Sequence, residues 1–290
     1  MKYKLIIVLL VGIFVLRSAE AGVATGIYDP FKKMEKVKFT YEHLWYYWQK
    51  PNPPEGNIYF QLKTVIKKGR TPIVTIEPWD IPAIGARVGL LPDIAAGKYD
   101  PIVTDLATQI GLLGYPVVIR WGHECECIPD YPWSGRPPGE YIAAYRHVAW
   151  IFKKYAPTSL MFWSPVGNKG VEVYYPGTDV VDYIGFTVLE YPQVSVGWFG
   201  HPQSFEGWVR EKYDRISQFN KPVIIPECGV YDTPANQKKW MQEAFASVDK
   251  FPLLQVVVYF NVKDHVTWKQ ADGKIKIPDW RISPSVFSTL

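Results

Sequence analysis

Short apolar runs alternate with longer amphipathic stretches along most of the chain. The short runs are rich in β-branched and aromatic residues, which is typical of buried strands, whereas the longer stretches repeat apolar residues every three or four positions, as helices do. The pattern predicts strands over residues 23–27, 40–47, 72–76, 116–121, 160–163, 181–187, 222–226 and 254–260. It predicts helices over residues 57–68, 101–113, 139–155, 204–219 and 234–248.

The order of these elements predicts an α/β fold, because a strand that returns beside its predecessor through a helix runs parallel to it. Such strands in a chain of 290 residues close most readily into a (β/α)8 TIM barrel, which typically needs about 250 residues. An open doubly wound sheet is the alternative, but no glycine-rich phosphate loop follows the first strand. The sequence contains no linker or internal repeat, so we expect a single barrel domain.

The N-terminus has the pattern of a signal peptide. Lys2 and Lys4 precede an apolar run over residues 5–16, and Ala19 to Ala21 form an A-x-A cleavage site. A membrane anchor is the alternative, but the apolar run is well short of the ~20 residues that a spanning helix needs. We therefore expect residues 1–21 to be removed and a mature catalytic barrel over 22–290 to be secreted to the extracellular or periplasmic space, without stable insertion in a membrane.

The composition favours a carbohydrate partner over nucleic acid. Lysine and arginine number 32 against 28 acidic residues, and the net charge of +4 leaves no basic footprint for nucleic acid. Three cysteines do not make a disulfide scaffold. The 12 tryptophans and 19 tyrosines combine a flat apolar face with a polar edge, which suits stacking against sugars.

Two glutamates follow predicted strands at the end where barrel enzymes place their chemistry. Glu124 comes after the apolar run 117–121, on the fourth strand, and Glu227 comes directly after 223–226, on the seventh. A lone acidic residue in such a place is more often a solvated loop residue or a helix cap. The pair is better explained by retaining glycoside hydrolysis, which needs a protonated and an ionised carboxyl group about 5 to 5.5 Å apart.

Several segments together resemble glycoside hydrolase family 26, which is best known for β-mannanases. They cover most of the chain in order, and the most specific part is the His-Glu strand end followed by Tyr-Pro-Trp; the segments are 26–29, 94–100, 120–124, 131–133, 145–148, 162–165, 174–177, 221–227 and 279–282. The resemblance implies a barrel with the acid/base on strand four and the nucleophile on strand seven. It makes Glu124 the acid/base, Glu227 the nucleophile, and His123 a neighbour that orients the carboxylates and the sugar.

Two departures from the family pattern concern the surroundings of the glutamates. Many members end the sixth strand with Gly-Ile-Asp-x-Tyr, where this chain has Thr187 in place of the acid and Leu189 in place of the tyrosine. That tyrosine is expected to hydrogen-bond the nucleophile. Tyr191, two residues further on and hence on the same strand face, is the candidate replacement. The second departure is the sequence of residues 125–127, where relatives usually have small or amide residues.

The cysteines beside Glu124 allow two further interpretations. Together with His123 they resemble zinc ligands, but no second pair completes a tetrahedral set and a structural metal would occupy the acid, so we expect no metal and no organic cofactor. Cys125 or Cys127 could form a disulfide with Cys228 if strands four and seven face each other. Unpaired small residues in tight packing are the equally open alternative.

Several aromatic residues are candidates for sugar binding. Trp133 follows the acid in a loop, and three others lie at the ends of strands three, five and eight: Trp79, Trp163 and Tyr259. Each has a core-packing alternative. Trp198 and Phe199 lie in a glycine-containing loop and could form walls of the cleft.

These observations predict a secreted retaining endo-β-glycanase, with β-1,4-mannan as the leading substrate by family resemblance. The alternatives within the family are β-glucan, β-xylan or an exopolysaccharide. A non-catalytic glycan-binding barrel and a metal-dependent hydrolase using the His-Glu-Cys cluster are the alternatives from other classes.

Overall fold

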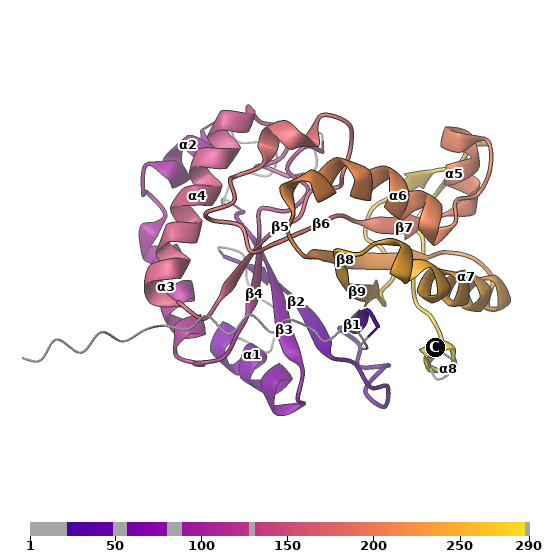
Figure 1. The fold of residues 1–290 in the computed structure, drawn as a ribbon, viewed down its shortest axis with the longest axis horizontal. Helices are drawn as coiled ribbons and strands as arrows, with labels where there is room; N and C mark the ends of the chain where they lie inside the picture. Colours follow the sequence, from indigo (N-terminus) through magenta and orange to yellow (C-terminus); the bar gives the residue numbers. More distant parts are fainter. Residues whose placement is uncertain (1–21, 49–56, 80–88, 128–130, 288–290) are drawn as a thin grey trace, which may run out of the picture.

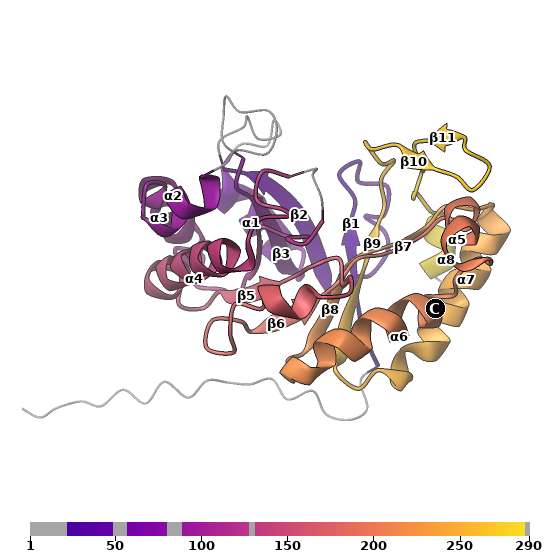
Figure 2. The same cartoon turned by 90° about the horizontal axis from the view of Figure 1, so that it is seen from above.

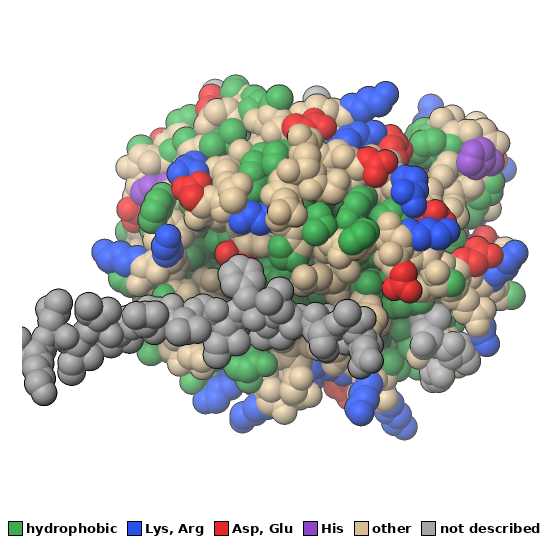
Figure 3. Space-filling model, in the orientation of Figure 1, with side chains coloured by type: hydrophobic (Ala, Val, Ile, Leu, Met, Phe, Trp, Pro, Cys, Tyr) green, Lys and Arg blue, Asp and Glu red, His purple; other side chains and the backbone are tan. Residues whose placement is uncertain are grey.

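The computed structural model describes residues 22–48, 57–79, 89–127 and 131–287. The predicted signal peptide lies outside the described residues. In the described part of the chain, no helix is both long enough and apolar enough to cross a membrane. The face shown in Figure 3 carries acidic and basic side chains interspersed, without a continuous basic surface.

Eight parallel strands form a closed barrel (Figure 1). Closure follows from two pairings, since β6 pairs with β8 and β9 pairs with β1. A short strand, β7 (Val188–Glu190), continues from β6 and pairs further along β8. The barrel strands are β1 (Ala24–Tyr28), β2 (Tyr41–Tyr47), β3 (Thr71–Glu77), β4 (Val118–Trp121), β5 (Leu160–Trp163), β6 (Tyr183–Gly185), β8 (Val223–Val230) and β9 (Leu254–Phe260). The predicted (β/α)8 TIM barrel is confirmed.

Helices surround the barrel on its outer side (Figures 1 and 2). Three of them begin at residues whose side chains accept a hydrogen bond from the backbone of the first turn, namely Asn57, Ser204 and Thr233. Proline occupies the first turn of four helices, one of which is the helix that begins after Thr233, and its missing N–H costs nothing at this position. The helices are α1 (Ile58–Lys67), α2 (Leu90–Ala95), α3 (Asp100–Gly111), α4 (Pro138–Tyr155), α5 (Pro192–Phe199), α6 (Phe205–Ile216), α7 (Pro234–Ser247) and α8 (Pro284–Phe287).

The sequence pattern finds the longer elements and misses the short ones. The predicted strand over 181–187 is shorter in the structure, where β6 covers only 183–185, and the chain forms a second short strand, β7, after Phe186 and Thr187. The pattern does not reveal α2, α5 or the hairpin of β10 (Trp268–Lys269) and β11 (Ile275–Lys276). Helices of six and eight residues and strands of two residues are too short for their periodicity to stand out.

The interior of the barrel changes from apolar to polar along the strands. Its apolar end is one cluster formed by Ala24, Ile73, Val118, Phe162, Ile224, Val256 and Val258. Because side chains alternate across a strand, the next inward positions on β3, β4 and β5 are Thr75, Arg120 and Ser164. All three are buried polar residues. The polar layer therefore lies at the C-terminal ends of the strands.

Candidate active site

A turn after β4 brings Glu124 over the barrel mouth. Gly122 and Glu124 both have left-handed backbone conformations, with φ of 54° and 53°. A non-glycine residue in this region costs on the order of 1 kcal/mol, so it persists where the surroundings fix it. Here the backbone N–H of Glu124 donates to Ser164 O at 2.9 Å, and Ser134 Oγ donates to Glu124 O at 2.6 Å.

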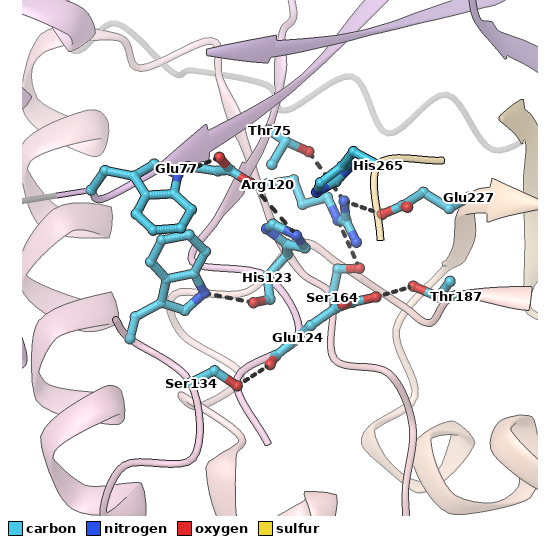
Figure 4. Close-up of polar contacts among 12 residues, drawn as sticks. Thr75, Glu77, Arg120, His123, Glu124, Ser134, Ser164, Thr187, Glu227 and His265 are labelled. Carbon is cyan, nitrogen blue, oxygen red and sulfur yellow. Dashed lines mark hydrogen bonds and ion pairs between the residues drawn. The ribbon is translucent and has the colours of Figure 1, made fainter. Parts of the chain in front are cut away.

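The carboxyl group of Glu124 is held in a setting that favours its protonated form. Thr187 Oγ1 donates a hydrogen bond to Glu124 Oε1 at 2.7 Å (Figure 4). Burial, and then the negative charge of Glu227, raise the pKa of Glu124 to about 7, while Arg120 and the Thr187 hydrogen bond oppose the rise. A carboxyl group with this pKa can both give and take a proton near neutral pH.

Glu227 faces the barrel interior because β8 is irregular at this point. The pairing of β8 with β9 runs from Ile225–Val257 to Cys228–Tyr259, so β8 has one extra residue between these pairs. Strict alternation from the inward Ile224 would turn residue 227 outward. The bulge reverses this, so that Cys228 packs in the outer core and Glu227 points inward.

Arg120 connects the barrel interior to Glu227. Its Nη1 lies 2.7 Å from Glu227 Oε1, and the guanidinium is fully buried. Arg120 Nε donates to Ser164 Oγ at 2.9 Å, and Nη1 donates to Thr75 Oγ1 at 3.2 Å. Because a guanidinium stays protonated in proteins, this pairing places a permanent positive charge beside the carboxyl group of Glu227.

Two buried histidines line the site in their neutral form. Burial, and then the positive charge of Arg120, lower the pKa of His43 and of His123 well below the ordinary value. His43 Nε2 shares a hydrogen bond with Thr75 Oγ1 at 2.7 Å. His123 Nε2 lies 3.9 Å from Glu77 Oε1, which is too long for a hydrogen bond. The His123 ring therefore acts as a neutral wall beside the carboxylates.

Aromatic rings cover His123 on the side of the site. Trp45 meets its ring edge to face at 4.9 Å, and Tyr131 lies at 4.8 Å. Trp133, which is 0% exposed, stacks under Tyr131 at 4.7 Å and donates from Nε1 to His123 O at 2.7 Å. Trp79 is partly exposed, and its Nε1 donates to Glu77 Oε2 at 2.6 Å. Trp79 therefore has surface available to a sugar, whereas Trp133 is buried and supports the strand end.

Two other rings predicted to contact the sugar, those of Trp163 and Tyr259, are buried away from the site. On β5, Phe162 faces the interior, so Trp163 points outward and packs against Tyr175 and Phe219. On β9, Val258 faces the interior, and the outward Tyr259 donates its hydroxyl hydrogen to Trp280 O. Because side chains alternate along a strand, neither ring faces the barrel interior, and the stacking role predicted for both is wrong.

The structure also corrects the role proposed for Tyr191. Tyr191 precedes α5, where the chain leaves β7, and it packs in a buried cluster with Val194, Phe260 and Trp280. Its ring meets Tyr231 edge to face at 4.8 Å. The phenols near the carboxylates are instead Tyr131 and Tyr28: burial raises the pKa of each, and the charge of Glu227 adds to the rise.

The residues after Glu124 have a structural role. Glu126 accepts hydrogen bonds from the backbone N–H groups of residues 166, 167 and 168, which fixes the loop after β5. Cys125 and Cys228 are buried free thiols. Within the described ranges, no group of three or more histidine, cysteine and acidic side chains is arranged to hold a metal ion.

Trp198 and Phe199 do not lie in a loop, as predicted, but on α5. Trp198 is 62% exposed, and its ring centre lies 6.4 Å from that of Trp268 on the β10–β11 hairpin.

Comparison with known proteins supports the fold. No protein-family model matches the chain. A family 26 β-mannanase from Bacteroides ovatus superposes with a TM-score of 0.65 at 15% identity, over 92% of this chain and 88% of that one. A β-mannanase from a symbiotic protist of the termite Reticulitermes speratus, solved with a gluco-manno-oligosaccharide, gives a TM-score of 0.59 at 13% identity, over 92% and 86% of the two chains.

At the level of sequence, the chain is similar to endoglucanase H of Acetivibrio thermocellus. The two are 27% identical over 218 residues, which make up 71% of this chain and 23% of that protein. The chain thus spans about a quarter of the length of this relative. The resemblance to glycoside hydrolase family 26 inferred from the sequence is therefore confirmed in the fold of the chain.

Proposed function

We propose that the protein is a retaining endo-acting hydrolase of a β-linked polysaccharide. The observation that carries the proposal is the contrast between the two glutamates at the barrel mouth. Glu124 has a pKa raised to about 7, whereas Glu227 is paired with the buried guanidinium of Arg120. Two carboxyl groups of one residue type in such different surroundings supply an acid and a nucleophile.

The reaction proceeds in two displacements. The Glu227 carboxylate attacks the anomeric carbon, the glycosidic C–O bond breaks, and the departing oxygen takes the proton of Glu124. Water then attacks the anomeric carbon of the glycosyl-enzyme, gives its proton to Glu124, and releases Glu227 as a carboxylate. Arg120 keeps Glu227 oriented through both steps, and no cofactor is needed.

Two substrates have support from the comparisons. The similar solved structures include β-mannanases, in agreement with the mannan predicted from the family resemblance. The relative found by sequence is called an endoglucanase, and this favours β-glucan as the second candidate. We also propose that the enzyme is exported, on the basis of the signal-peptide pattern at the N-terminus.

A panel of mannan, mixed-linkage β-glucan, xylan and bacterial exopolysaccharides tests this function. We expect new reducing ends and shorter chains from one polymer, with the anomeric configuration of the first product retained by proton NMR. Glu124→Gln and Glu227→Gln should abolish cleavage, whereas Glu243→Gln on the exposed face of α7 should not. Tight binding of a polymer without any new reducing ends would instead identify a non-catalytic glycan-binding barrel.

A further inference from the structure

A buried lysine lies behind the acid/base glutamate. Lys212 belongs to α6 and is only 7% exposed. Its Nζ donates a hydrogen bond to Thr187 O at 2.6 Å and lies 5.1 Å from the ring centre of Trp208. The stem passes over Gly167, where an added Cβ would lie 3.1 Å from Lys212 Cβ. The absence of a side chain at Gly167 makes room for the lysine.

The partner of Lys212 is the residue that contacts Glu124. Thr187 accepts from Lys212 with its carbonyl oxygen and donates to Glu124 Oε1 with its hydroxyl group. Lys212, on a helix outside the barrel, is thus linked through one residue to the carboxyl group at the barrel mouth. A shift of the ammonium group would move Thr187 and with it the hydrogen bond to Glu124.

The charged groups around Lys212 come from two elements. Glu124, Glu126 and Cys127 face it from the segment after β4, and Glu211 faces it from its own helix. Arg215, one turn further along α6, directs its guanidinium to Gly167 O at 2.6 Å instead. Burial of an ammonium group is costly unless negative charges compensate it. The carboxyl groups of Glu124, Glu126 and Glu211 contribute this compensation.

We propose that Lys212 is a positioning residue, whose buried ammonium group holds Thr187 against Glu124 and adds a second positive charge, besides that of Arg120, to the surroundings of the Glu124 carboxyl group. The lysine does not exchange a proton with the substrate. A nearby positive charge favours the ionised form of a carboxyl group, so Lys212 acts against the burial and the repulsion from Glu227 that favour the protonated form. The naming of Glu124 as the acid/base rests on the proposed function.

Lys212 carries its charge under the conditions in which Glu124 titrates. Burial lowers the pKa of Lys212 to about 8, and the surrounding carboxylates limit the fall. At pH 7 most molecules therefore have the ammonium form, and the charge is lost only above the pKa of Glu124, which is about 7. The two groups titrate close enough to influence each other.

The decisive test follows the Glu124 carboxyl group directly by carbon-13 NMR of protein labelled at glutamate, with Glu124→Gln to assign the signal. In Lys212→Met, which removes the charge and keeps an unbranched stem, we expect the titration midpoint of Glu124 to rise by about one pH unit. Lys212→Arg restores the charge and should return the midpoint towards that of the wild type. Lys239→Met, at an exposed position on α7, should leave it unchanged.

A wild-type measurement covers the case in which Lys212→Met does not fold. The Glu124 signal should show a second inflection as Lys212 loses its proton, at a pH near 8. An unchanged midpoint in folded Lys212→Met, or a single inflection in the wild type, overturns the inference. Neither readout needs a substrate, so the result stands apart from the outcome of the polysaccharide panel. With an active substrate, Lys212→Met should also move the basic limb of kcat/KM to higher pH.

Discussion

The raised pKa of Glu124 implies a stability cost that one substitution can remove. In the folded protein this pKa is about 7, compared with 4.5 for an unperturbed glutamate. Between these two values the folded state binds more protons than the unfolded state, so stability falls as the pH rises through this window. At about 1.4 kcal/mol per pKa unit, the difference makes the wild type less stable by roughly 3 kcal/mol above pH 7.

Glu124→Gln should recover this free energy, because the amide has no charge to bury and its oxygen can still accept from Thr187 Oγ1. Urea unfolding of both proteins at pH 5, 6, 7 and 8 measures the effect. We expect the variant to gain little at pH 5, progressively more up to pH 7, and a constant amount above it. Glu243→Gln, with its exposed carboxyl group, is the control and should show no such trend. A stability difference for Glu124→Gln that does not vary with pH would refute the reasoning.

Three further predictions concern the site and its surroundings. First, kcat/KM on the active polysaccharide should fall as pH rises through about 7, the pKa of Glu124, because the proton needed by the leaving oxygen is lost; a rate that stays constant to pH 9 contradicts this. Second, Arg120→Met should lower the free energy of unfolding by about 3 to 5 kcal/mol, measured in urea, because Glu227 keeps a buried charge without a partner. Third, Trp133→Ala should lower the free energy of unfolding by about 3 to 5 kcal/mol, because the ring is fully buried. Trp198→Ala, at an exposed ring, should have little effect on the melting temperature.

The alternation of side chains explains which parts of the site the sequence could reveal. Glu124 and Glu227 stand out because each follows an apolar run at the correct end of a barrel strand. The sequence also indicates that Arg120 belongs to the site, because a charged residue inside the apolar run 117–121 must be paired if it is buried. In the sequence Arg120 stands out only as part of the segment 120–124, whereas in the structure its Nη1 lies 2.7 Å from Glu227 Oε1.

The errors among the aromatic residues have a different origin. Trp163 and Tyr259 lie near the C-terminal ends of their strands, as predicted, but their side chains point outward from the barrel. The assignment of a strand alone does not show which of its residues point inward. The bulge in β8 is equally hidden, because one extra residue reverses the direction of everything after it. Contacts that depend on loops, such as Tyr131 stacked over Trp133, require the folded chain.

The neighbours of Thr187 explain what threonine, in place of an acidic residue, does at this position. An acidic residue there would add a third negative charge beside Glu124 and Glu227, and would raise the pKa of Glu124 further. Thr187 instead donates a hydrogen bond to Glu124 and is itself held by Lys212. Burial and Glu227 thus raise the pKa of Glu124, while Arg120 and Thr187 lower it. In the reaction that we propose, one group must donate a proton in the first displacement and accept one in the second, so a balance close to neutral pH would serve both steps.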